Sequence, residues 1–155
     1  MEKLKILGGI LKRINNFNGK MSPFGERLIL QKTIYLMQAF GLNIGYIFSW
    51  YIHGPYSIQL TRDGYEMINT YDKFEEIEFN EEDEAKFSEF IEFLGDKKEN
   101  PEWLEVVASI HVLKKIQPEK SKDEIIRSVM QKQPECFTKE MCLEAWEHLE
   151  EYGLI

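Results

Sequence analysis

The chain has 155 residues, of which 43% are hydrophobic and 13% aromatic; this composition is typical of one folded domain and excludes an intrinsically disordered protein. Its net charge of −8 is unevenly distributed, because residues 1–70 carry 8 basic and 4 acidic side chains whereas residues 71–155 carry 11 and 23. An acidic protein repels phosphates, so general nucleic-acid binding is disfavoured.

The sequence shows no sign of secretion, membrane insertion or a zinc site. It contains neither a signal-peptide core nor an apolar run approaching the ~20 residues of a membrane helix. Cys136 and Cys142 lie six positions apart without a second cysteine pair, which does not match a zinc pattern. We therefore expect a cytoplasmic protein that uses no metal and no cofactor.

The N-terminal residues predict a helix and a loop before a second helix. Apolar spacing predicts a helix over Lys3–Phe17, which Gly8-Gly9 should interrupt. A phosphate-binding loop is another explanation of the two glycines, but the following Lys-Ser/Thr and the preceding strand of such loops are missing. Ser22-Pro23 then opens the second helix.

The second helix, over residues 28–40, carries an apolar face and a polar stripe. Its apolar side chains cover so much of the circumference that most of the helix should be buried. Gln31, Tyr35 and Gln38 form the polar stripe, and buried amides and hydroxyls need hydrogen-bond partners. The stripe therefore either satisfies neighbouring backbone groups or forms a small recognition surface.

An aromatic run follows this helix. The side chains of Tyr46–His53 alternate between two apolar or aromatic faces, which predicts a strand covered on both sides. Gly54-Pro55 should end the strand because proline lacks an N–H, and Ser57 should cap the next helix. Large aromatic side chains are typical either of a packed core or of a partner groove. Those gathered here with a polar tip are Trp50, Tyr51, His53 and Tyr56.

These two segments resemble a known family. LQKTIYLMQ, followed at this distance by an aromatic strand and GPYS, resembles the Panacea-type (SocA-like) antitoxin domain and the related YwgA-like proteins over roughly residues 25–65. His53 stands where that family usually has an aromatic residue. The resemblance implies protein binding, because such domains neutralise varied toxins and one acts as a proteolytic adaptor. The matching positions are Leu30, Gln31, Lys32, Tyr35, Gln38, Gly54, Pro55 and Ser57.

An acidic region follows, with 12 acidic and 4 basic residues in 71–99. Tyr71–Phe79 alternates imperfectly and predicts either a short edge strand or an extended linker. Phe87, Phe90 and Leu94 then lie on one face of an amphipathic helix that Gly95 should end. The change in composition suggests a subdivision of the single domain 1–155 into residues 1–70 and 80–155.

The last third predicts three helices. Pro101 starts the first, Ser121 with Glu124 forms a capping box for the second, and Thr138 caps the third. Three helices with short links resemble a winged-helix arrangement, whose recognition helix would be 139–151. That helix carries five glutamates against one lysine, so its direct readout of DNA is disfavoured.

Residues that could carry catalysis are scattered. His53, His111 and His148 are far apart and match no metal-binding spacing. Ser57 near His53 suggests a hydrolase, but no Gly-x-Ser-x-Gly elbow surrounds the serine, whose capping role is the better explanation. His111, inside an apolar helix, is expected to be partly buried and hydrogen-bonded.

The sequence thus predicts a mainly helical α+β fold: a compact domain of about seven helices with one small β element and a winged-helix-like three-helix C-terminal part. We expect a non-enzymatic protein-interaction module, antitoxin- or adaptor-like, whose partner is a protein such as a basic toxin. The alternative function is that of a nucleic-acid-associated regulator. Formation of a homodimer is compatible with either function. The expected partner-binding residues are Gln31, Lys32, Tyr35, Gln38, Trp50, Tyr51, His53, Gly54, Pro55, Tyr56 and Ser57.

Overall fold

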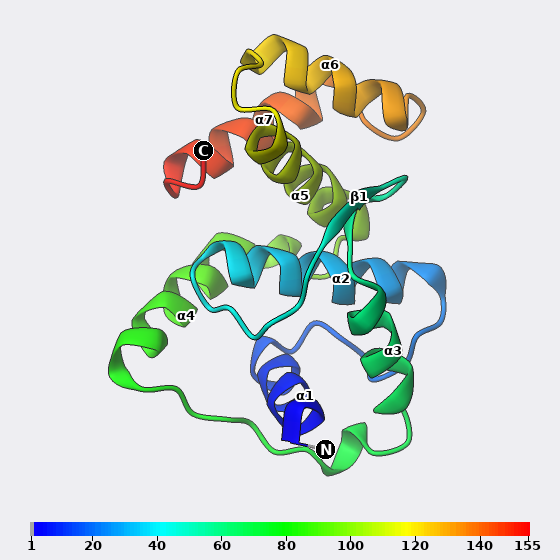
Figure 1. Cartoon of the computed structure of the whole chain (residues 1–155), viewed down its shortest axis with the longest axis vertical. Coiled ribbons are helices and arrows are strands. Elements are labelled where there is room, and N and C mark those ends of the chain that lie inside the picture. Colours follow the sequence, from blue (N-terminus) through cyan, green and yellow to red (C-terminus); the bar gives the residue numbers. More distant parts are fainter. Residues whose placement is uncertain (1) are drawn as a thin grey trace.

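A computed structural model describes residues 2–155, and this part of the chain is mainly helical with one two-stranded antiparallel sheet, as predicted. Helix α2 runs through the middle of the molecule, with α1 and α3 on one side and α5, α6 and α7 on the other (Figure 1). In chain order the elements are α1 (Glu2–Ile14), α2 (Phe24–Ala39), β1 (Ser49–Tyr51), β2 (Gly54–Tyr56), α3 (Ile58–Glu66), η1 (Tyr71–Lys73), α4 (Glu81–Leu94), η2 (Gly95–Lys97), α5 (Pro101–Ile116), α6 (Lys122–Lys132) and α7 (Lys139–Glu151).

Helices α2 and α5 pack against each other and form the centre of the core. Every residue of α2 from Ile29 to Met37 is buried, as is every residue of α5 from Trp103 to Ile110. The prediction that the second helix is buried on most sides is confirmed. Because such a helix must bury polar positions as well, their side chains need partners inside the protein.

The helix starts follow local capping chemistry. Ser121 and Glu124 form the predicted capping box of α6, and Pro101 is the first residue of α5, also as predicted. Gly95 follows the last residue of α4, where glycine commonly ends a helix. The side chains that accept a backbone N–H at the start of a helix are those of Ser57, Asn80, Asn100, Ser121 and Thr138.

The glycine pair of α1 does not interrupt the helix, which runs unbroken to Ile14 and ends three residues earlier than expected. The pair instead lies under the chain that precedes α4. A Cβ on Gly8 would lie 2.0 Å from a ring carbon of Phe74, and one on Gly9 would lie 2.8 Å from the carbonyl oxygen of Glu75. The two glycines therefore allow a close approach of backbone and side chain that no larger residue permits.

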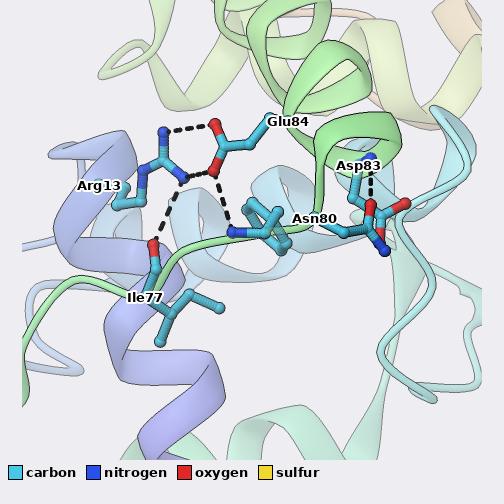
Figure 2. Close-up of polar contacts among 6 residues, drawn as sticks. Arg13, Ile77, Asn80, Asp83 and Glu84 are labelled. Carbon is cyan, nitrogen blue, oxygen red and sulfur yellow. Dashed lines mark hydrogen bonds and ion pairs between the residues drawn. The ribbon is translucent and has the colours of Figure 1, made fainter.

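The chain between η1 and α4 is an extended linker, and residues 74–80 contain no strand. The linker is fastened to α1 and α4 through Arg13, whose guanidinium donates to both carboxylate oxygens of Glu84 and to the carbonyl of Ile77 at 3.4 Å (Figure 2). Glu84 also accepts from the backbone N–H of Phe79 at 3.0 Å. These bonds connect the N-terminal part of the chain to the acidic part that follows.

The β element is a hairpin, which the sequence did not predict. Ser49 pairs with Tyr56, Trp50 with Pro55 and Tyr51 with Gly54. The prediction that Gly54-Pro55 ends a strand over Tyr46–His53 is wrong, because the chain reverses at Ile52-His53 and Gly54 begins the second strand. Gly54 adopts a φ of +88°, a conformation that favours glycine, and proline is tolerated in an edge strand.

The three C-terminal helices pack on one another, and no strand occurs among the described residues 101–155. All five glutamates of α7 are exposed: Glu140, Glu144, Glu147, Glu150 and Glu151. Within residues 2–155, none of the helices combines the length and the apolar character required to cross a bilayer.

Candidate functional site

The polar stripe of α2 holds the backbone of the hairpin region. The side-chain amide of Gln31 donates to the carbonyl oxygen of Ser57 at 2.9 Å and accepts from its N–H at 2.8 Å. Gln38 does the same with Tyr46, at 2.9 Å and 3.1 Å. Of the two roles left open for the stripe, satisfaction of neighbouring backbone groups is the one observed for these glutamines.

Lys32 lies between the two glutamines and holds the strand β2. Its side chain is fully buried, and its Nζ donates to the carbonyl oxygen of Pro55 at 2.6 Å. Burial lowers the pKa of Lys32 to about 7, although the negative charge of Glu105 acts in the opposite direction. A Cβ on Gly54 would lie 2.5 Å from Oγ of Ser109, so the hairpin turn packs against α5 more closely than another residue would allow.

A second group of polar contacts joins the hairpin turn to α5 and α6. Nδ1 of His53 lies 3.4 Å from Oε2 of Glu105 and 2.7 Å from Nε2 of Gln133, which itself donates to Glu105 at 3.1 Å. Burial raises the pKa of Glu105, whereas the neighbouring His53 and Lys32 act to lower it. Lys132 donates to the carbonyl of Tyr51, so the turn is held from α2, α5 and α6.

The arrangement around His53 does not assemble a nucleophile beside a base. Ser57 is buried, and its hydroxyl accepts the N–H of Leu60 as the cap of α3. The serine of the hydrolase alternative is thus engaged in helix capping. Among residues 2–155, no three His, Cys, Asp or Glu side chains are grouped closely enough to hold a metal ion.

Tyr35, the third member of the polar stripe, pairs with His111 of α5. The Tyr35 hydroxyl lies 2.7 Å from Nδ1 of His111, and burial lowers the pKa of His111 to about 4 and raises that of Tyr35. The histidine is therefore neutral at pH 7, and the prediction that it is partly buried and hydrogen-bonded is confirmed. The pair forms one wall of a cavity of about 430 Å³ whose other wall includes Phe48 and Trp50.

Large apolar side chains are exposed around the hairpin. Ile52 is 72% exposed and Ile47 is 83% exposed. A cavity of about 250 Å³ lies between the start of α2 and the hairpin, and another of about 370 Å³ lies beside Ile47; both are lined by Tyr51 and Tyr56, so they adjoin. We call this surface the hairpin face, and its apolar and aromatic members are Phe24, Ile47, Tyr51, Ile52, Tyr56 and Ile58.

The structure brings the sequence-predicted site residues together around the hairpin but at different depths. Six of them are buried: Gln31, Lys32, Tyr35, Gly54, Pro55 and Ser57. Four reach the surface at least in part: Trp50, Tyr51, His53 and Tyr56. Gln38 is half-buried.

Four members of the hairpin face were missed by sequence reasoning. Ile47 and Ile52 belong to the aromatic run, where apolar character suggested a strand covered on both sides. Phe24 is the first residue of α2, and Ile58 is the first of α3. The turn itself gave no signal, because its residues Ile52 and His53 are not the Asn-Gly, Asp-Gly or Gly-containing pairs that are typical of a two-residue hairpin loop.

Comparisons with known proteins found no matching family model, no matching curated protein and no matching solved structure.

Proposed function

We propose that this protein is a non-enzymatic protein-interaction module, antitoxin- or adaptor-like, that binds a partner protein with its hairpin face. The observation that carries the proposal is the concentration of exposed Ile and Tyr side chains on and directly beside one short hairpin. Contiguous exposed apolar surface marks interaction sites, and aromatic side chains with a polar tip are frequent anchors there.

The polar contacts beneath the hairpin support the same proposal. Gln31 and Lys32 of α2 bond to the backbone of Ser57 and Pro55, and Gln133, the residue that follows α6, bonds to His53 of the turn. A surface fixed before binding loses less conformational freedom when the partner docks. In this interpretation the motif residues that carry the family resemblance build the scaffold, and the residues beside them make the contacts.

The charge of the whole molecule bears on the partner. The net charge of −8 and the exposed glutamates of α7 attract a basic protein over long distances, as expected for a basic toxin. Such attraction increases the rate of encounter more than the final affinity. The contacts at the hairpin face decide which segment of the partner is held.

The test is affinity capture from native lysate with two matched variants. Ile52→Asp places a charge on the hairpin face, whereas Ile116→Asp places it on a residue that is 55% exposed at the end of α5, outside that face. We expect wild-type protein and Ile116→Asp to retain the same partner and Ile52→Asp to lose it. Equal retention by both variants would exclude the hairpin face, and a partner-free monomer at physiological salt would contradict the proposal as a whole.

A further inference from the structure

Acidic residues are absent from residues 27–62, which contain most of the hairpin face. Residues 27–62 contain Arg27, Lys32 and Arg62 but no aspartate or glutamate, although the chain has 27 acidic residues. The two carboxylates packed against this segment, those of Asp63 and Glu105, are both 4% exposed and hydrogen-bonded inside the protein. Because Lys32 is fully buried, the charge that this segment offers a partner at the surface is that of Arg27 and Arg62.

Two cations are fixed at the borders of the hairpin. Arg27 lines the 250 Å³ cavity; its guanidinium stacks on Phe24 at 4.9 Å and donates to the carbonyl of Met21 at 2.7 Å. Lys132 lies 3.8 Å from the ring centre of Trp50 and donates to the carbonyl of Tyr51. Both side chains are only half-buried, and each retains further N–H donors for a ligand.

The cavity between α2 and the hairpin has the size of a site for one side chain. Its volume of about 250 Å³ is below the ~300–1,000 Å³ of pockets that hold whole small ligands. Its walls include Phe24, Leu28 and Ile52, so the occupant that fits them is apolar. The amide of Gln31, which also lines the cavity, already donates to Ser57 and Thr61, so both of its N–H groups are engaged.

We infer that the partner segment held by the hairpin face is a short peptide stretch with one large apolar side chain flanked by acidic residues. The apolar side chain occupies the cavity beside Phe24, and the flanking carboxylates pair with Arg27 and Lys132. This inference rests on the proposed function and adds the chemistry of the bound segment. A basic partner can still approach the acidic helices, but the residues that flank its anchoring apolar side chain are acidic.

A phage-displayed library of random peptides, selected on the wild-type protein, tests this chemistry. We expect enrichment of sequences that combine one large apolar residue with neighbouring Asp or Glu. Enrichment of basic or uncharged sequences, or no enrichment, would overturn the inference. If the protein instead forms a dimer that Ile52→Asp dissociates, a second copy is the occupant and the inference fails as well.

The enriched peptide is then labelled and its affinity measured by fluorescence anisotropy. Arg27→Gln and Lys132→Gln remove the charges but keep a side chain that can donate, and Lys115→Gln neutralises an exposed lysine outside the hairpin face as the control. We expect the double variant Arg27→Gln/Lys132→Gln to bind about tenfold more weakly or worse, and the control to bind as wild type. Thermal melts establish that each variant is folded.

The two proposals fail in different ways. In one outcome, Ile52→Asp abolishes capture of the cellular partner, while the double variant binds peptide and partner as wild type does. This outcome would support binding through the hairpin face and would refute the acidic character of the bound segment. If Ile52→Asp leaves capture unchanged, the proposed function itself is refuted. If the peptide affinity of the wild type depends on salt and that of the double variant does not, the ion pairs are formed by Arg27 and Lys132.

Discussion

Lys32 is the residue whose environment differs most from its usual one. A lysine without exposure, held by a single carbonyl, has its charged form destabilised by the loss of water. The partial compensation comes from Glu105 of α5, beyond ion-pair distance but within electrostatic reach. Protonation of the Lys32 amine is therefore coupled to its hydrogen bond with the backbone of β2.

This environment predicts an unusual dependence of stability on pH. The pKa of Lys32 is about 7 in the folded protein and 10.5 without burial, so between these values the unfolded chain binds more protons. The free energy of unfolding should then rise from pH 7 to pH 9, by up to about 1.4 kcal/mol per pH unit. Urea denaturation across this range measures the rise, and Lys32→Met should remove it. An equal slope in the variant would show that Lys32 is not its source.

Gln31 offers a second prediction, because both ends of its amide bond to the backbone of Ser57. Gln31→Ala leaves the buried N–H of Ser57 without a partner, while the carbonyl of Ser57 keeps only the N–H of Thr61, and this costs roughly 1–3 kcal/mol of the free energy of unfolding. Gln59→Ala, at an exposed position where the side chain bonds only to Asp63, serves as the control and should change stability by less than about 0.5 kcal/mol. Similar losses in both variants would contradict the scaffold role of Gln31.

Some helix starts could be predicted from the sequence, whereas the hairpin could not. The starts of α5, α6 and α7 were predictable, because Pro101, Ser121 and Thr138 act on their own helix. The hairpin was not, because its turn residues Ile52 and His53 are not typical of such turns, and because Gly54 packs closely against Ser109, which is 55 positions away. A signal that depends on a neighbour distant in sequence cannot be read from local spacing.

The same distinction applies to the candidate site. Its location was predictable, since the aromatic run and the polar stripe lie around one hairpin. The depth of each side chain was not, because exposure of Ile47 and Ile52 depends on how far the hairpin projects from α2 (Figure 1). Nor could spacing place Gln133 beside His53, which are 80 positions apart.

The junction of α1 with the linker yields a prediction at the level of elements. Alanine is a better helix former than glycine by about 1 kcal/mol, yet Gly8→Ala should destabilise the protein because the new Cβ meets the ring of Phe74. In a Phe74→Ala background the same change should be neutral or stabilising. Chemical denaturation of the four proteins measures this reversal, and a destabilising Gly8→Ala in both backgrounds would contradict it.

The molecule as a whole carries its charges in separate regions. The exposed glutamates of α7 lie on the last helix, while residues 27–62, which contain no acidic side chain, form most of α2 and the hairpin, whose strand β2 packs against both α2 and α5 (Figure 1). Under the proposed function, the glutamates of α7 attract basic surfaces and the hairpin face binds an acidic segment. This separation is typical of proteins whose charges direct association.

The charge distribution predicts that the protein does not bind duplex DNA through α7. Its exposed side offers carboxylates where phosphates and base edges need donors and positive charge. Fluorescence anisotropy with a labelled duplex at low ionic strength should show no binding. A complex that weakens steeply as salt is added would instead favour the nucleic-acid-associated alternative.

The contacts from Lys132 and Gln133 to the hairpin turn have a consequence for biosynthesis. The turn leaves the ribosome well before the residues that hold it, and at usual elongation rates translation of the intervening stretch takes on the order of several seconds. During that interval the nascent chain lacks the α6 contacts of the turn. The turn therefore gains its full set of contacts only once translation has passed the end of α6, and under the proposed function an unfinished polypeptide would lack a complete binding surface.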